Sequence, residues 1–126
     1  LKLWLAFRVH GADEFRAALE RNLAQARLCH DLASAATDFE VMPLRPTLSV
    51  VPVRHLVPGC PDIDLHNAAL TDALQRDGRV YVSPATIDEQ EWLRPCFTNV
   101  RTRTQDVHVF LDVARELGRA ICPGHE

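Results

Sequence analysis

Histidine and cysteine are the residue types in this chain best suited to hold a metal ion or to attack a substrate. The chain contains six histidines and four cysteines. They are His10, His30, His55, His66, His108 and His125, and Cys29, Cys60, Cys96 and Cys122. No C-x-x-C pair and no H-E-x-x-H motif occurs among them, so their spacing does not indicate a zinc site. A small metal-dependent hydrolase is therefore the least favoured class of function.

Cysteine reactivity is a second possibility for chemistry. Cys96 with a distant histidine could form a nucleophile pair, but a cysteine that fills a strand position in the core is the favoured interpretation. The absence of a dense cysteine framework predicts reduced thiols in a cytosolic protein, and we expect three of the four cysteines to be buried. A disulfide framework is less favoured.

Arginines form the third group with chemical potential. Arg94 interrupts an apolar segment, and a buried guanidinium costs free energy unless a carboxylate pairs with it. Arg94, Arg101 and Arg103 could together attract an anion; the alternative is surface arginines plus one buried ion pair. No aromatic residues are interleaved with them, so a nucleic-acid surface is only weakly indicated.

Size and composition limit the classes of protein that fit. The chain has 126 residues, a net charge of -3, 47% hydrophobic residues and 25% charged residues, which is typical of one globular domain. No apolar run is long enough to cross a bilayer, and no signal-peptide pattern is present. The chain starts within an apolar segment and has a single lysine, Lys2. The first of these features suggests a fragment of a longer polypeptide.

Apolar periodicity predicts the elements that must position these residues. Helical spacing indicates helices over about 1–10, 13–35, 63–77 and 104–121, and β-favouring residues indicate strands over about 39–42, 48–53, 79–83 and 92–99. The first helix is apolar nearly all round, so it needs cover from other polypeptide.

Glycines and prolines mark where the predicted elements end. Gly11 is expected as the residue that follows the first helix, Gly78 as the stop of the third, and Pro123 with Gly124 as the end of the last. Asp62 or Asp64 is the expected N-cap of the third helix.

These elements predict a two-layer α+β domain with a four-stranded, mostly antiparallel sheet and helices packed on one face. The last two strands form a hairpin through residues 88–90, and the prolines Pro84 and Pro95 indicate strand ends, edges or a bulge.

The ordered set of residues resembles the C-terminal part of the group II pyridoxal-phosphate-dependent amino-acid decarboxylases, the aromatic-amino-acid and tyrosine decarboxylase group. The similarity extends over essentially the whole chain. The matching positions are Lys2, Trp4, Arg8, Gly11, Phe15, Arg16, residues 39–41 and 48–53, Asn67, Leu70, Gly78, Leu93, Arg94, Cys96, Phe97 and residues 99–102.

The resemblance implies a cytosolic, homodimeric decarboxylase that uses pyridoxal 5'-phosphate (PLP) to remove the α-carboxyl group of an amino acid, with an aromatic amino acid as the expected substrate. It implies that residues 1–11 lead from a large cofactor domain and that residues 12–126 form the C-terminal small domain of a fold-type I decarboxylase. The family's Schiff-base lysine and cofactor-binding residues lie upstream of the matched region, so no catalytic, cofactor-binding or metal-binding residue transfers to this chain.

Arg94 is the one position whose role transfers, as a candidate for supporting the active site. A structural partner for a carboxylate within the small domain is the equally favoured alternative.

The sequence also departs from the family pattern. The family hairpin commonly has Asp-Gly where this chain has Asp88-Glu89, and glutamate rarely adopts a positive φ. A longer turn or another turn type is therefore expected here. Arg103 stands where the family often has a capping threonine, so Thr104 is the expected cap of the last helix.

Two readings of function follow. The first is a decarboxylase fragment that is inactive and binds no cofactor by itself. The alternative is a stand-alone α+β binding or interaction module without catalytic activity. Neither reading indicates a nucleic-acid or membrane partner.

Overall fold

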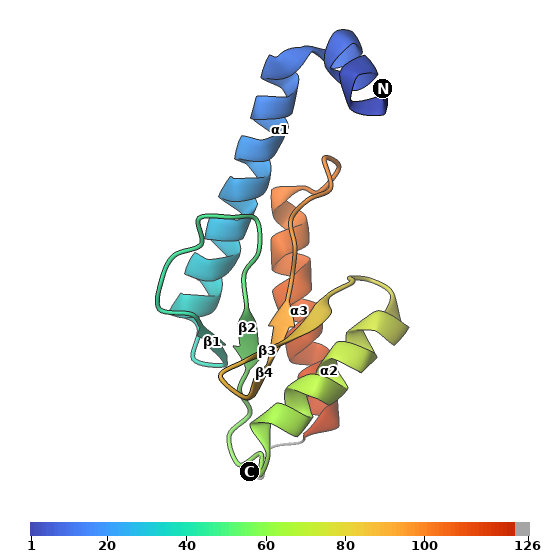
Figure 1. The fold of residues 1–126 in the computed structure, drawn as a ribbon. Helices are drawn as coiled ribbons and strands as arrows, with labels where there is room; N and C mark the ends of the chain where they lie inside the picture. Colours follow the sequence, from blue (N-terminus) through green and yellow to red (C-terminus); the bar gives the residue numbers. More distant parts are fainter. Residues whose placement is uncertain (123–126) are drawn as a thin grey trace.

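The computed structural model describes residues 1–122, which form three helices and one sheet of four strands. The elements are α1 (Lys2–Ala35), β1 (Phe39–Val41), β2 (Val53–His55), α2 (Ile63–Asp77), β3 (Ser83–Ile87), β4 (Gln90–Arg94) and α3 (Thr104–Ile121). The strands are antiparallel and lie in the order β1-β2-β4-β3 (Figure 1). The predicted α+β class and four-stranded antiparallel sheet are confirmed.

The helix α1 is broken at Gly11, where the sequence predicted a boundary between two helices. Gly11 has φ 78° and ψ 159°, a conformation open almost only to glycine. It differs from the left-handed C′ conformation that we expected, since that conformation has a much smaller ψ. The chain therefore turns sharply at Gly11, and the first turns of α1 leave the axis of the rest (Figure 1).

The helices α2 and α3 have the predicted bounds. The side chain of Asp62 accepts a hydrogen bond from the Leu65 N–H at 2.9 Å, and Gly78 ends α2 in the left-handed conformation at φ 80°. At the start of α3, the Asp106 carboxylate accepts from the Arg103 N–H at 2.8 Å. Thr104 is the first helical residue, so the expectation that it caps α3 was wrong. Pro123 and Gly124 lie outside the described residues.

Two prolines explain why β2 and β4 are shorter than predicted. The predicted strand over 48–53 does lie beside β4 and its extension, since the Val51 N–H donates to the Pro95 carbonyl at 3.2 Å and the Phe97 N–H to the Ser49 carbonyl at 2.8 Å. Pro52 and Pro95 have no N–H to donate, so the ladder between these segments is interrupted. Regular β2 pairing begins only at Val53, opposite Leu93.

The first strand of the β3–β4 hairpin lies further along the chain than predicted. It spans Ser83–Ile87, whereas a strand over about 79–83 was expected. Ile87 pairs with Gln90, so Asp88 and Glu89 alone make the turn, with φ of 50° and 62°. The expectation of a longer turn or another turn type was wrong: this is a two-residue hairpin with positive φ at both positions. The turn sets the register of β3. Because β3 is an edge strand, it tolerates Pro84, which has no N–H to donate to a neighbour.

All three helices contribute buried residues to a core on one face of the sheet. The cluster includes Cys29 and Ala33 of α1, Leu70 and Leu74 of α2, and Phe110 and Ala114 of α3. From the sheet it includes Phe39, Val53 and Leu93, and strand pairing places these three on the same face. Glu40, Arg54, Trp92 and Arg94 belong to the opposite face.

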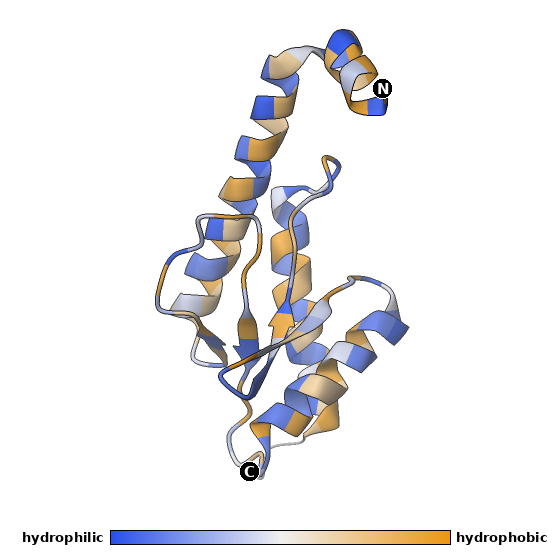
Figure 2. Cartoon of the chain, viewed as in Figure 1, coloured by the Kyte–Doolittle hydropathy of each residue, from blue (hydrophilic) through white to orange (hydrophobic). Residues whose placement is uncertain are grey.

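The N-terminal segment, residues 1–10, projects from this body with its apolar residues uncovered (Figure 2). Leu1, Leu3, Trp4 and Val9 are 91%, 65%, 58% and 74% exposed. Phe7 contacts Phe15 at a ring distance of 4.5 Å across the break at Gly11. None of the described helices is both long and apolar enough to span a membrane.

Candidate functional site

The most enclosed charged group of the described chain is Arg54, on the sheet face opposite the helical core. Its side chain is 8% exposed and donates to the carboxylates of Glu40 at 3.0 Å and Asp64 at 2.7 Å. Its guanidinium carbon also lies 5.5 Å from the centre of the Trp92 ring. Charge-assisted hydrogen bonds and ring stacking both favour arginine over lysine at such a position. The sequence reasoning missed Arg54, although a charged residue directly after Val53 in an apolar strand was a usable signal.

The first turns of α2 enter the gap that opens between β2 and β4. Asp64 also accepts from the Glu91 N–H at 2.9 Å, so one carboxylate joins Arg54 of β2 to the backbone of β4. Asn67 accepts from the His55 N–H at 2.8 Å and donates to the His55 carbonyl at 3.1 Å. The Asn67 amide therefore replaces the strand partner that β2 lacks at this position.

Two buried histidines meet beneath this contact. His55 Nδ1 lies 3.0 Å from His66 Nε2, so one ring donates to the other. Burial, reinforced by the neighbouring His66, lowers the pKa of His55 to about 4, although Asp38 opposes the shift. Burial also lowers the pKa of His66. Both rings are consequently neutral near pH 7, and the pair is a structural element of the α2–β2 contact.

Arg94 is exposed at the end of β4, so the expectation of a buried arginine in this strand was wrong. No carboxylate within residues 1–122 lies in ion-pair contact with it. Trp92 and Arg94 are two positions apart on one strand and therefore point to the same face. Arg54 points to the same face, so this face carries both the buried Arg54 and the exposed Arg94.

The cysteines are less buried than predicted. Only Cys29 is buried within the described residues, and burial raises its pKa to about 12, which makes it a poor nucleophile. Cys96 is exposed rather than part of the core, because Pro95 and Phe97 are the residues that point inward there. Among the described residues, the Cys96 Sγ contacts the Arg94 carbonyl at 3.7 Å rather than a histidine.

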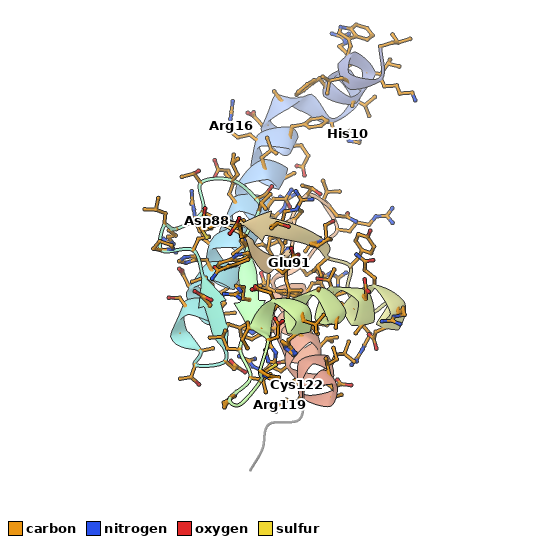
Figure 3. All side chains as sticks on the ribbon, turned by 60° about the horizontal axis from the view of Figure 1, so that its bottom comes forward. His10, Arg16, Asp88, Glu91, Arg119 and Cys122 are labelled. Atoms are coloured by element: carbon orange, nitrogen blue, oxygen red, sulfur yellow. The ribbon has the colours of Figure 1, made fainter. Side chains whose placement is uncertain are left out.

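The histidines do not gather into one centre. His10 lies on the N-terminal segment, far from Arg119 and Cys122 at the end of α3 (Figure 3). His30 contacts the Met42 carbonyl at 3.0 Å, His108 is exposed on α3, and His125 lies outside the described residues. Within residues 1–122, no three histidine, cysteine or acidic side chains are arranged to hold a metal ion.

Lys2, the single lysine of the chain, is exposed at the start of α1. It belongs to the projecting N-terminal segment, and no carboxylate of residues 1–122 lies in ion-pair contact with it. A lysine that binds PLP covalently needs a closed pocket to orient the ring and its nitrogen. The described residues therefore do not fit this cofactor.

No family model matches the chain. It is 27% identical over 110 residues to an aromatic-L-amino-acid decarboxylase of Bacillus atrophaeus, a match that covers 85% of this chain and 23% of that protein. The resemblance to these decarboxylases that the sequence indicated is thereby confirmed.

Solved structures show where this fold occurs. Oryza sativa TDC with PLP and tryptamine superimposes with a TM-score of 0.83 at 20% identity, covering 96% of this chain and 26% of that one. The glutamate decarboxylase domain of the Vibrio parahaemolyticus diaminobutyrate-pyruvate transaminase and L-2,4-diaminobutyrate decarboxylase gives 0.84 at 22% identity, covering 94% and 25%. At this level of identity the match establishes the fold, and the chain spans about a quarter of the length of these proteins.

Proposed function

We propose that this chain is the C-terminal small domain of a PLP-dependent amino-acid decarboxylase that works as a cytoplasmic homodimer. One observation carries the proposal: similarity to a decarboxylase extends over 85% of the chain but covers 23% of that protein. In this proposal residues 1–11 lead from the large domain and residues 12–126 form the small one.

The reacting centre lies on other polypeptide in this proposal. PLP supplies an electron sink for the carbanion left when the carboxyl group departs. The described residues contribute no lysine in a closed pocket, so they act by supporting the large domain rather than by contacting the reacting atoms.

Arg94 is the residue through which we propose that this support acts. It is exposed on the sheet face opposite the core, without a carboxylate in contact among the described residues, so its charge is free to meet a group outside this domain. Arg54 on the same face is already paired with Glu40 and Asp64.

An aromatic amino acid is the proposed substrate, supported by the name of the Bacillus atrophaeus relative. In this proposal the choice of substrate is set by the large domain, which carries the reacting centre.

The reading frame that encodes this chain tests the proposal directly. We expect the continuous frame to encode a large domain with a His-Lys element before residue 1, and the complete protein to release CO₂ from an aromatic amino acid when PLP is present. A start codon close to residue 1 would instead favour the stand-alone module.

Cofactor binding by the present chain gives an independent test. The purified chain mixed with PLP should show no lysine-bound absorbance band after dialysis, since Lys2 is exposed and unsupported. A band that survives dialysis, and that Lys2→Arg abolishes, would overturn the assignment of the cofactor to other polypeptide.

A further inference from the structure

A cleft lies between α1 and the segment that joins β4 to α3. Its volume is about 820 Å³, within the range of small-molecule sites. It is lined from α1 by Arg21, Ala24, Gln25 and Leu28, and from the joining segment and the start of α3 by Val100, Arg101, Thr102, Arg103 and Thr104. Figure 1 shows this joining segment, in orange, rising beside α1.

Positive charge dominates the walls of this cleft. Arg21, Arg101 and Arg103 all line it. Arg21 has one carboxylate nearby, Glu14 at 3.5 Å, and both side chains are more than half exposed, so that pair is weak. Arg101 and Arg103 have no carboxylate in ion-pair contact within the described chain; Asp106 accepts from the Arg103 backbone, not from its guanidinium.

The start of α3 adds to this positive potential. Thr104, the first residue of α3, lines the cleft, so the positive end of an 18-residue helix faces it. Asp106 offsets part of the dipole, yet the guanidinium groups outnumber the carboxylates at the walls.

Gln25 gives the cleft a polar wall that the fold does not fully satisfy. The residue is 6% exposed, and its Nε2 donates to the Thr102 carbonyl at 2.6 Å. Its Oε1 is buried without a hydrogen-bond partner within the described chain. A buried acceptor without a partner costs free energy, so a ligand that carries a hydroxyl donor fits this wall better than one with acceptors alone.

We propose that this cleft binds a phosphate group, as inorganic phosphate or as a small phosphomonoester. Guanidinium groups bind phosphate oxygens in a bidentate manner, and the α3 N-terminus adds backbone N–H donors. A monoprotonated phosphate or a ligand hydroxyl supplies the donor that Gln25 Oε1 lacks. The proposal does not depend on the decarboxylase function, because every residue it uses lies in the described chain and none belongs to the face of Arg94.

The test is a phosphate titration of the full 126-residue chain, followed by backbone and side-chain amide NMR shifts at constant ionic strength. We expect saturable shifts for the amides of residues 101–105 and for the Gln25 side chain. Glucose 6-phosphate, titrated in parallel, distinguishes the sources: tighter binding identifies a phosphomonoester site, and weaker or equal binding identifies a site for the free ion.

Two sets of variants make the result decisive. The double variant Arg101→Gln/Arg103→Gln alters only exposed side chains, so it should fold, and it should weaken binding by about tenfold or more. Arg27→Gln, an exposed arginine of α1 that does not line the cleft, should leave binding unchanged. Shifts that never saturate, or that the double variant and Arg27→Gln alter equally, would show general charge screening and overturn the proposal.

Discussion

At the residue scale, the sheet face opposite the core places two arginines in opposite environments. Arg54 is enclosed by Glu40, Asp64 and the Trp92 ring, whereas Arg94 is exposed. A guanidinium held by two carboxylates and a ring contributes to stability, and one that reaches into solvent does not. Stability on this face is therefore expected to depend on Arg54, which leaves Arg94 for the role proposed for it.

Substitution of these two arginines tests this expectation. Arg54→Met should lower the free energy of unfolding by about 2–4 kcal/mol, because Asp64 and Glu40 lose their partner. Both carboxylates remain partly solvated, which limits the loss. Arg94→Met should change it by less than about 0.5 kcal/mol. Urea denaturation of both variants measures this, and equal losses would contradict the assignment. In the complete enzyme, Arg94→Met should lower decarboxylation while the cofactor spectrum is retained.

The His55–His66 pair predicts a dependence of stability on pH. The folded pKa of His55, about 4, lies below its ordinary value of 6.5, so the unfolded chain binds more protons between these values. Stability is therefore fully present above about pH 6.5 and falls as the pH drops toward 4. Between pH 7 and pH 5 we expect a loss of about 2 kcal/mol, to which His66 adds in the same direction.

Denaturant titrations at several pH values check this expectation. His108→Gln, which removes an exposed histidine of α3, should keep the full pH dependence. His55→Gln should lose most of it, whatever its own stability. A His55→Gln variant with an unchanged slope between pH 5 and pH 7 would show that other groups are responsible.

The sequence indicated that Arg94 matters, but it did not predict the burial or the partners of Arg94 and Arg54. Arg94 was singled out because Trp92 and Leu93 precede it, and strand alternation alone did not tell which face is covered. Arg54 lay just past the predicted end of its strand, and its partners come from β1 and α2, which are 14 and 10 residues away. Pairs of this kind follow from the packing of elements, which local patterns do not encode.

At the element scale, the helices and β1 were predicted almost to the residue, whereas β2, β3 and β4 were displaced. The bounds of α2 and α3 follow from local signals, namely Asp62, Gly78 and the apolar spacing of α3. Strand bounds depend on partners instead. Residues 79–82 are rich in valine yet precede β3, because the Asp88-Glu89 turn sets which residues of that edge strand face Gln90–Arg94.

Gly118 shows how closely α3 packs on β2. A Cβ at this position would overlap the imidazole ring of His55. Alanine normally stabilises a helix interior by about 1 kcal/mol relative to glycine. Here Gly118→Ala should instead lower stability, by about 1–3 kcal/mol, because the ring has to move within a packed core.

Thermal denaturation of a double-mutant cycle measures this contact. In a His55→Ala background, Gly118→Ala should no longer destabilise the protein, since the overlapping ring is gone. Ala120→Gly, at an exposed position of the same helix, should show the ordinary helix propensity and lose about 1 kcal/mol. If Gly118→Ala raised the melting temperature in the parent chain, the close approach of α3 to β2 would be wrong.

At the scale of the whole molecule, the apolar side chains are distributed unevenly. The body buries a continuous core against one face of the sheet. The N-terminal segment, in contrast, exposes Leu1, Leu3, Trp4, Leu5 and Val9 beyond the break at Gly11. Such a contiguous apolar surface is typical of a segment that packs against other polypeptide. It agrees with the proposal that residues 1–11 lead into a large domain.

This surface predicts self-association of the chain when it is purified by itself. Removing the exposed apolar area from water favours contact between two N-terminal segments, at about 25 cal/mol for each Å² buried. Sedimentation velocity over a range of concentrations should therefore show species larger than the monomer. The double variant Leu3→Glu/Val9→Glu should restore the monomer, because both side chains are more than half exposed and lie on that segment.

The loop residue Leu44 provides the matched control. It is 83% exposed, like the residues of the N-terminal segment, but it lies between β1 and β2 in the body of the domain. Leu44→Glu should leave association unchanged, since a single exposed leucine does not form an extended apolar surface. A parent chain that remains monomeric at high concentration would mean that the N-terminal segment needs no cover. The strongest physical reason for expecting a partner domain would then be gone.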